Sequence, residues 1–451
     1  MAPAKHSSVI TLTFNPAGLR WVLILPALLA LTGAWFAIRW YVGNTIAEYT
    51  STPDADGIEM ARVATRWSPD DALTHWRLAN LQERNFSAEN LAAAVHEYQL
   101  AVQVEPYDFR YWMELGRALE AAGDIENGEK ALRRAVELAP AYSHPRWQYG
   151  NLLLRQGRVD EAFAELSRAA EADSQMESPV FGLATQLFDG DIDKIGRALP
   201  SGSLRLHFAL SLIGAGKPDQ ALQVVNTVSA ADRKSESESI SDLIKAFMRR
   251  RHYRAALALL PDAQADRSQL PSPDSIWNGG FELPVAYRDE TPFHWLINPS
   301  SQAQIVIDNT RPHSGRNSLR VTFKSPNKLE SVAISQTVVV EPEAQYKLQF
   351  YQRSEALITA SVPVVVVNDS QGKPLASAPP LPSGTSDWQL VTLNFKSNSG
   401  EDGVLITFSR NPCSNQDPIC PIFGNIWYDD FNLQRISGAG AQTANARSSS
   451  R

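Results

Sequence analysis

The stretch FRYWMELGRALEAAGDIENGEKALRRAVELAPA (109–141) decides how this chain folds. Its first half carries apolar and small residues at the spacing of one helix face, namely Trp112, Leu115, Gly116 and Leu119. After a turn at Gly123, a second helix is marked by Gly128, Leu132 and Ala135, and Pro140 ends it. Small residues allow two helix axes to approach to about 8–10 Å, so the stretch predicts a closely packed helical hairpin. Such a unit cannot bury its apolar face alone, and it therefore predicts neighbours.

The same pattern returns at a fixed shift along the chain. Gly116, Gly123, Gly128 and Ala135 are followed 34 positions later by Gly150, Gly157, Ala162 and Ala169. Weaker versions extend the pattern over residues 58–262, and the segment 58–69 matches only the second helix of a unit, which we interpret as a cap. The sequence therefore predicts an all-α solenoid over residues 58–262.

This pattern resembles the tetratricopeptide repeat in its Trp, Leu-Gly, Ala and Pro positions, most clearly over residues 75–175. The resemblance implies a solenoid whose concave groove holds a peptide or a helix of a protein partner, and it implies binding rather than catalysis. At these spacings we expect Trp76, Trp112 and Trp147 to be packing residues of the repeats.

An apolar run, WVLILPALLALTGAWFAI (21–38), precedes the repeats. As a helix it rises about 27 Å, close to the hydrocarbon thickness of about 30 Å, so we expect a transmembrane helix over 21–41. Lys5 and Arg20 precede the run and acidic residues follow it, which favours a cytoplasmic N-terminus (1–20) with the bulk of the chain outside, in the inner membrane of a bacterium. The rival interpretation is a cleaved signal peptide, but bulky aromatic residues fill the zone where a small-residue cleavage site would lie.

The hydrophobic period changes after residue 275. Residues 263–275 are rich in Pro, Ser and Asp and are expected to be a linker. About eight short alternating or β-branched runs follow, separated by turn clusters, which predicts an all-β two-sheet sandwich over 276–435. The tail 436–451 has little apolar content and is expected to be disordered.

The predicted sandwich resembles jelly-roll domains of the carbohydrate-binding-module and galactose-binding type. The resemblance rests on WNGGFE (277–282), HSGRNSLRV (313–321), DWQ (387–389) and the closing IWYDDF (426–431). In that family the opening segment and an Asp of the last strand often meet at a structural calcium, which nominates Glu282 and Asp430 with loop oxygens near 314–317. Calcium prefers six to eight oxygen ligands. The alternative is that the two carboxylates only hydrogen-bond strand ends or pair with arginines.

Sugar binding requires flat aromatic side chains that stack on pyranose faces. Trp295, Trp427 and Tyr287 are our candidates for such a glycan platform, and packing inside the sandwich is the alternative for each. The two cysteines, Cys413 and Cys420, predict a disulfide that closes a short loop, provided that this end of the chain lies outside the cytoplasm. A zinc site is disfavoured because no His or further Cys lies nearby in the sequence.

The sequence contains no persuasive catalytic motif, and we expect no enzyme. Ser325-x-x-Lys328 lies in a turn between predicted strands rather than at a helix start. Asp429 and Asp430 are adjacent on a strand, so their side chains should point to opposite faces of the sheet and not act as a pair. The formal net charge of -7 argues against a nucleic-acid partner, since binding phosphates requires concentrated Lys and Arg.

Together these features favour a membrane-anchored, non-catalytic scaffold in bacterial envelope or exopolysaccharide assembly. Its repeats would bind a protein partner, while the sandwich would contact polysaccharide or dock on the helices. Two alternatives remain at this point: a glycan-acting enzyme or its substrate-targeting subunit, and a cell-surface lectin whose repeats form a stalk.

Overall fold

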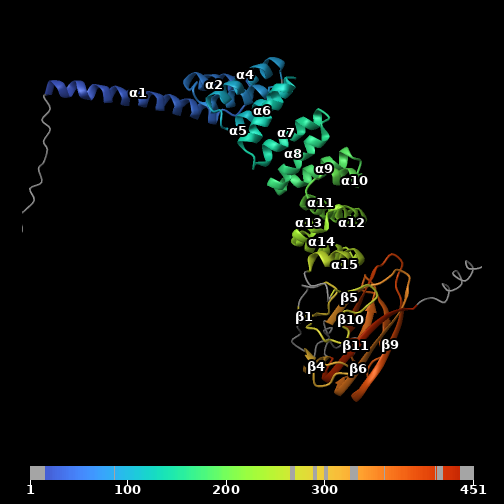
Figure 1. The fold of residues 1–451 in the computed structure, drawn as a ribbon. Coiled ribbons are helices and arrows are strands. Elements are labelled where there is room, and N and C mark those ends of the chain that lie inside the picture. The colour runs from blue at the N-terminus through green and yellow to red at the C-terminus, as the bar shows by residue number, and fades with distance from the viewer. Residues whose placement is uncertain are drawn as a thin grey trace, which may run out of the picture. The chain divides into compact units, whose positions relative to one another are not determined.

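The computed structural model describes residues 16–436 except 86, 265–269, 288–291, 299–302, 326–333, 360, 412 and 414–419. Most of the predicted cytoplasmic segment (1–20), nearly all of the predicted tail (436–451) and the middle of the predicted linker (263–275) lie outside the described residues. The rest follows the predicted order of an apolar N-terminal helix, a long helical region and an all-β region (Figure 1).

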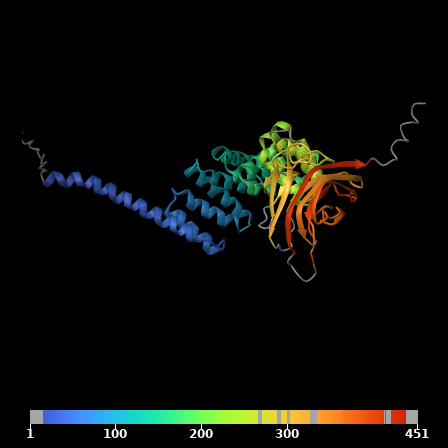
Figure 2. The same cartoon turned by 90° about the horizontal axis from the view of Figure 1, so that it is seen from below.

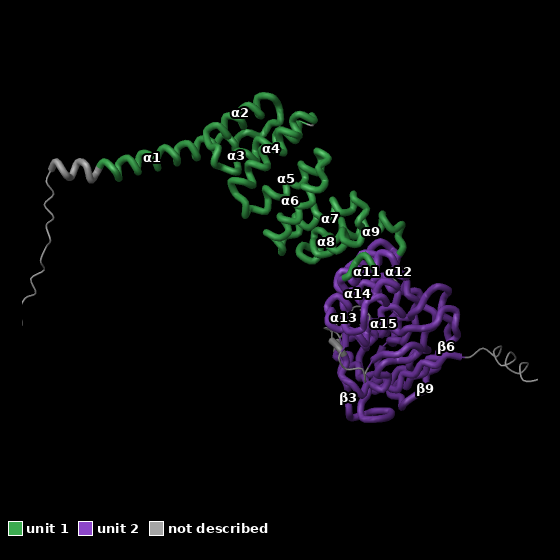
Figure 3. Tube along the Cα trace, turned by 45° about the horizontal axis from the view of Figure 1, so that its top comes forward, with its two compact units in different colours: residues 1–191, 197–200 green, residues 192–196, 201–451 purple. Residues whose placement is uncertain are grey.

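Two compact units divide the chain (Figure 3). The first comprises residues 1–191 and 197–200, and the second comprises residues 192–196 and 201–451, so the last helices of the repeat region belong to the same unit as the strands. The helices of the first unit are α1 (Pro16–Tyr49), α2 (Ala55–Trp67), α3 (Ala72–Glu83), α4 (Ala88–Val104), α5 (Phe109–Ala121), α6 (Ile125–Leu138), α7 (Ser143–Arg155), α8 (Val159–Ala172) and α9 (Glu177–Leu187).

A single continuous helix, α1, opens the chain (Figure 2). Within Ile24–Tyr49 it is long and apolar enough to cross a membrane, a character that a signal sequence shares. Its last turns pack against α2 and α3: Ala47 is fully buried, and a Cβ on Gly43 would lie 2.6 Å from Ser68 Cβ. We interpreted residues 58–69 as the second helix of an incomplete repeat. The end of α1 packs against this helix (α2) and so acts as the first helix of that repeat.

Close approach of the paired helices depends on glycine, as the sequence predicts. A Cβ on Gly116 of α5 would lie 2.6 Å from Leu132 Cγ of α6, and one on Gly128 would lie 3.0 Å from the Gly116 carbonyl oxygen. Gly150 meets Leu166 in the same way, at 2.7 Å, in the next pair. These contacts leave no room for a side chain between the two helices of a pair.

The turn within each pair also repeats. Gly123 and Gly157 have φ angles of 86° and 76°, a left-handed conformation that favours glycine. The residue after each glycine closes the helix in the same way, because Asp124 N donates to the Leu119 carbonyl (2.9 Å) and Arg158 N to the Leu153 carbonyl (3.0 Å). One local motif, repeated along the chain, thus sets the geometry of successive pairs.

The second unit joins helices to a two-sheet sandwich. Its helices are α11 (Gly202–Gly214), α12 (Pro218–Thr227), α13 (Ala230–Ser235), α14 (Ser237–Arg249) and α15 (Tyr253–Ala263), while α10 (Ile192–Ala198) is divided between the units. One sheet has the strand order β1-β2-β5-β10-β7-β8 and the other β3-β4-β11-β6-β9. The strands are β1 (Ala286–Tyr287), β2 (Leu296–Ile297), β3 (Ala303–Asp308), β4 (Ser318–Ser325), β5 (Ile334–Val339), β6 (Gln345–Thr359), β7 (Val364–Asn368), β8 (Pro374–Ser377), β9 (Gly384–Lys396), β10 (Gly403–Ser409) and β11 (Ile422–Ile436).

The sandwich docks on the last helix through hydrogen bonds that join side chains to backbone groups. Asp402, just before β10, accepts hydrogen bonds from the backbone N–H groups of Tyr253 (3.1 Å) and Arg254 (2.8 Å) at the start of α15. The Arg254 guanidinium donates to the Val340 carbonyl at 3.1 Å. A Cβ on Gly403 would lie 2.3 Å from the Tyr253 ring, so α15 and the sandwich are in tight contact.

The close helix contact at Gly116 yields a stability prediction. Gly116→Val should lower the free energy of unfolding by about 1–3 kcal/mol, because the new side chain overlaps Leu132. The matched control is Gly182→Val in α9, where a Cβ would meet nothing within 4 Å, and its effect should stay within about 0.5 kcal/mol. Urea unfolding followed by circular dichroism measures both. Equal effects at the two positions would contradict the close-packed pair.

Candidate functional site

A column of side chains runs along the first helices of three successive pairs. Met113, Trp147 and Phe181 occupy the same place in α5, α7 and α9, each 34 positions after the last. Met113 and Trp147 are half-buried, and Phe181 is more deeply covered. Neighbouring first helices touch directly, as α1 does with α3 and α5 with α7. First helices that contact one another form the inner side of a solenoid, so we infer from the 34-residue spacing that this column lies on the groove side, with Met113 also packed against the cluster around Leu132.

Polar side chains one turn further along the same helices complete the column. Asn151 Nδ2 donates to the Trp147 carbonyl (2.7 Å), and Thr185 Oγ1 donates to the Phe181 carbonyl (2.8 Å). These bonds use donors of the side chains and leave the Asn151 oxygen as an acceptor for a ligand. A row of one methionine and two aromatic side chains, flanked by amide and hydroxyl groups, suits an extended or helical peptide better than a small charged substrate.

Salt bridges connect neighbouring helical repeats near these residues. Arg117 of α5 reaches Glu83 of α3 at 2.8 Å and Glu114 of its own helix at 2.8 Å. Glu83 also accepts a hydrogen bond from the Tyr98 hydroxyl at 3.0 Å. Burial raises the pKa of the Glu114 carboxyl, although the nearby Arg117 opposes that shift. These groups satisfy one another, so we assign them to holding the repeats in register.

The aromatic residues predicted to form a glycan platform occupy other environments. Trp295 is fully buried in the sandwich core, where its ring contacts Phe281, Phe408 and Phe431 and its Nε1 donates to the Asn278 carbonyl (3.2 Å). Its ring faces are therefore closed to a sugar, and packing is its role. Tyr287 lies in β1, and its side chain is outside the described residues.

Trp427 lies on the opposite side of its sheet from the core but is covered there. Its Nε1 donates to Asp308 (2.6 Å), and the guanidinium carbons of Arg311 and Arg353 lie 5.6 and 5.9 Å from the ring centroid. Only 2% of the residue is exposed, so the arginines occupy the positions where a sugar would stack. In this arrangement Trp427 anchors a polar network and is not a free platform.

The outer face of the five-stranded sheet carries an aromatic group that the sequence analysis did not nominate. His313 stacks on Tyr351 of β6 with ring centroids 3.6 Å apart, and Trp388 of β9 meets His313 edge-on at 5.5 Å. Tyr351 and Trp388 are half-buried, so part of each ring reaches solvent. The alternation of each strand places both side chains outward, but only the pairing of β6 with β9 brings them together.

The carboxylates nominated for calcium both contact one loop, through backbone N–H groups and two side chains of that loop. Glu282 Oε1 accepts from the backbone N–H groups of Arg316 (2.7 Å) and Asn317 (3.1 Å). Asp430 contacts His313 Nδ1 (2.6 Å) and Ser314 Oγ (2.7 Å). The alternative that these groups only hydrogen-bond loop and strand ends thus describes the observed geometry.

Asp429 joins the same loop, against our expectation that it and Asp430 would point apart. Its Oδ2 accepts from the backbone N–H groups of His313 (2.8 Å) and Ser314 (3.3 Å). The physical reason is a β-bulge in the pairing of β11 with β6 between residues 429 and 432, where Asp430 adopts a φ of 55°. The bulge breaks the two-residue alternation, so both carboxylates reach residues 313–314.

The residues around this loop do not fit a calcium ion as they are arranged. Calcium requires oxygen ligands, whereas backbone N–H groups point at Glu282 and Asp429, and Asp430 contacts the His313 ring nitrogen and the Ser314 hydroxyl. Within the described residues, no group of three or more His, Cys, Asp or Glu side chains could hold a metal ion. We therefore assign the three carboxylates to fastening the opening segment and the 313–317 loop onto β11.

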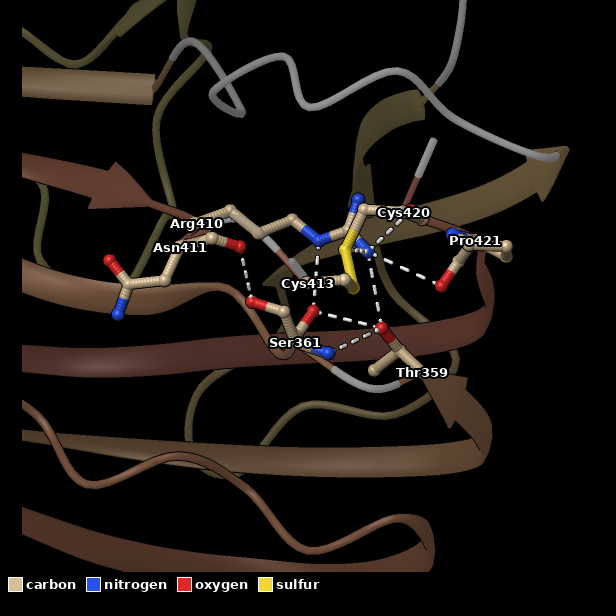
Figure 4. The surroundings of a disulfide bond; sticks show 7 residues. All are labelled: Thr359, Ser361, Arg410, Asn411, Cys413, Cys420 and Pro421. Carbon is tan, nitrogen blue, oxygen red and sulfur yellow. Dashed lines mark hydrogen bonds between the residues drawn. A yellow bond between two sulfur atoms is a disulfide. The ribbon is translucent and has the colours of Figure 1, made fainter. Parts of the chain in front are cut away.

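Cys413 and Cys420 form a disulfide beside a buried arginine (Figure 4). Arg410 donates through Nε to the Ser361 carbonyl (2.8 Å) and through Nη2 to the Cys420 carbonyl (2.6 Å) and Thr359 Oγ1 (3.1 Å). Burial lowers the pKa of Arg410. The guanidinium thus organises three chain segments around the cross-link, which is a structural role.

Comparison with known proteins identifies the helical pattern. Residues 86–143 and 113–177 match the family model of the tetratricopeptide repeat. This part of the chain consists of tetratricopeptide repeats. A stretch of 100 residues is 27% identical to Superkiller protein 3 of Saccharomyces cerevisiae, spanning 22% of this chain but only 7% of that protein, so the chain covers a small part of its relative.

Two solved structures are similar to separate parts of the chain. YrrB, described as a tetratricopeptide-repeat protein with an unusual peptide-binding site, is 16% identical and covers 48% of this chain and 95% of its own, with a TM-score of 0.25. The CBM22-1 xylan-binding domain of Xyn10C from Paenibacillus barcinonensis is 12% identical and covers 37% of this chain and 94% of its own, also with a TM-score of 0.25. At these identities and TM-scores, neither ligand passes to this chain.

The buried Asp429 carboxyl generates a pH prediction. Burial raises its pKa to about 6, although the backbone N–H groups it accepts oppose that shift. An unfolded aspartate titrates near pH 3.9, so the folded chain holds an extra proton between about pH 4 and 6. The contribution of the Asp429 carboxyl to the free energy of unfolding is therefore fully present below about pH 4 and is lost as the pH rises to about 6. The difference in Tm between wild type and Asp429→Asn should fall across that window; a constant difference would contradict this assignment.

Proposed function

We propose that this chain is a membrane-anchored, non-catalytic scaffold of bacterial envelope or exopolysaccharide assembly. Its tetratricopeptide repeats bind a protein partner, and its sandwich contacts polysaccharide. The apolar part of α1 is an uncleaved single span in the inner membrane, with the N-terminus in the cytoplasm and the repeats and sandwich outside.

Packing at the end of α1 supports an anchor over a cleaved signal. Arg39 Nε donates to the Trp67 carbonyl (2.9 Å), Asn44 Nδ2 donates to Asp71 (3.3 Å), and Ala47 is fully buried against the first pair. These residues follow the apolar run without a break in the helix. Because the first repeat needs this helix to cover its apolar face, keeping α1 stabilises the solenoid.

The observation that carries the proposed partner binding is the column Met113, Trp147 and Phe181 on the first helices of successive repeats. Trp147, which the sequence analysis expected to pack within the repeats, is half-buried at the centre of this column. A rigid aromatic ring at the centre of a groove is the kind of residue that dominates binding energy at protein interfaces.

The test is capture of partners by the full chain from membranes of the source cells. Trp147→Ala should reduce recovery of the shared partner by about tenfold or more, since a central Trp is typically worth at least about 2 kcal/mol. Lys130→Ala on the exposed side of α6 is the matched control and should recover the partner normally. Circular dichroism checks that both variants fold. Equal recovery by wild type and Trp147→Ala would contradict partner binding through the groove of the repeats.

A second candidate function, glycan recognition, is favoured by the Tyr351, His313 and Trp388 group on the outer sheet face. Half-exposed rings offer stacking area, while the exposed Asp387 carboxylate beside Arg353 offers hydrogen-bond groups for hydroxyls. The same face would serve the alternatives, a glycan-targeting subunit or a lectin with the repeats as a stalk.

A glycan array probed with the purified full chain tests this candidate. Trp388→Ala should abolish any binding to neutral or acidic polysaccharides, because it removes one of the stacking surfaces that we nominate. Lys396→Ala at the other end of the same strand is the matched control, since this exposed residue pairs with Gln345 and not with Tyr351. Absence of binding by wild type across the array would leave the sandwich with a purely structural role.

A further inference from the structure

The turn between α2 and α3 lies at the level where the apolar run of α1 ends. Arg39 is the first charged residue after that run, and it bonds the carbonyl of Trp67, the last residue of α2. Gly43 packs against Ser68 in the same turn. The helices α1 and α2 are therefore antiparallel, and the chain returns to the level of Arg39 before α3 begins.

Because the helices pack antiparallel, every second turn of the first unit lies on the same side as the α2–α3 turn, at the level of Arg39. Because successive helices of the repeats alternate in direction, the turns α2–α3 (67–71), α4–α5 (104–109) and α6–α7 (138–143) share one edge of the unit. We call these three turns the near edge. If α1 spans a bilayer, as proposed above, the near edge is the one that faces it.

The near edge carries exposed aromatic side chains. Trp67 is 38% exposed, Tyr107 80% and Tyr142 60%. Tyr142 and Phe109 lie with ring centroids 5.1 Å apart, and together with Val104 and Tyr107 they line one shallow hollow. Apolar surface gathered at one place and left open to solvent marks an interaction site.

The charges at the near edge indicate which kind of lipid surface it could contact. Glu105 and Asp108 flank the hollow, and Asp108 is paired with Arg110 (Nε to Oδ1, 3.0 Å). Asp70 and Asp71 lie in the first of the three turns. This balance gives no attraction for anionic lipid headgroups. Trp and Tyr rings nonetheless favour the headgroup region of any bilayer, because one end of each ring is apolar and the other is polar.

We propose that the near edge rests on the surface of the bilayer that α1 spans. The rings of Trp67, Tyr107 and Tyr142 lie in the headgroup region, so the first repeats run along the membrane instead of projecting from it on a free stalk. This inference rests on the proposed anchor. Attachment is through ring insertion, so zwitterionic lipid suffices.

The test uses the full chain in zwitterionic phosphatidylcholine nanodiscs. Its described cysteines are both in the disulfide, so one fluorescent label reports one added cysteine. Tyr107→Cys and Tyr142→Cys probe the near edge. Ile125→Cys, in an exposed position at the opposite edge, is the matched control, and Leu25→Cys probes the apolar span itself. The quenchers are a nitroxide on the lipid headgroup, a nitroxide on the acyl chain, and aqueous iodide.

We expect the headgroup nitroxide to quench the labels at 107 and 142 several-fold more than the label at 125. Strong acyl-chain quenching at 25 with equal quenching at 107, 142 and 125 would overturn the near-edge inference while leaving the anchor intact. Absence of acyl-chain quenching at 25 would overturn the anchor, and the inference with it. Labels at 107 and 142 that are shielded from iodide yet not quenched by lipid would assign the near edge to a protein contact and also overturn it.

Discussion

A helical hairpin has an apolar face that it cannot cover by itself, and this constraint governs the whole chain. Within the repeats each pair covers its neighbour through contacts as close as that between Gly116 and Leu132. The constraint is hardest to satisfy at the two ends of the helical region, where no neighbouring repeat covers the apolar face. At each end, a part of the chain that is not a repeat covers that face instead.

At the start, the end of α1 acts as the first helix of the first pair, with Ala47 buried and Gly43 against the following turn. At the finish, the sandwich takes the place of the next pair. Asp402 caps the start of α15, and Gly403 leaves room for the Tyr253 ring. The apolar N-terminal helix and the β-domain are thus structural parts of the helical region as well as candidates for functions of their own.

The repeats were predictable because their spacing is local. Gly123 and Gly157 each require a left-handed turn, and the 34-residue shift between them is visible in the sequence. The role of α1 was not predictable in this way, since an apolar run long enough for a membrane hides the weaker repeat pattern that begins at its end. The predicted domain boundary at 262–276 likewise says nothing of Asp402, which reaches α15 from far along the chain.

Prediction of the candidate sites was poorer, for reasons of geometry. Alternation along a strand tells which side chains share a face, but not which face is buried or what covers the other. Trp295 therefore turned out to be core, and Trp427 is covered by Arg311 and Arg353, which are distant in sequence. The bulge at Asp430 carries no clear sequence signal, yet it brings two neighbouring carboxylates to one loop.

Hydrogen exchange of the full chain tests most directly whether the sandwich covers the open end of the helical stack. Asp402→Ala removes the carboxylate that accepts hydrogen bonds from the backbone N–H groups of Tyr253 and Arg254 at the start of α15. Our account predicts faster amide exchange in α14 and α15, with exchange in α5–α8 unchanged. Unchanged exchange in α15 would mean that the helices need no cover from the strands, and would contradict the account.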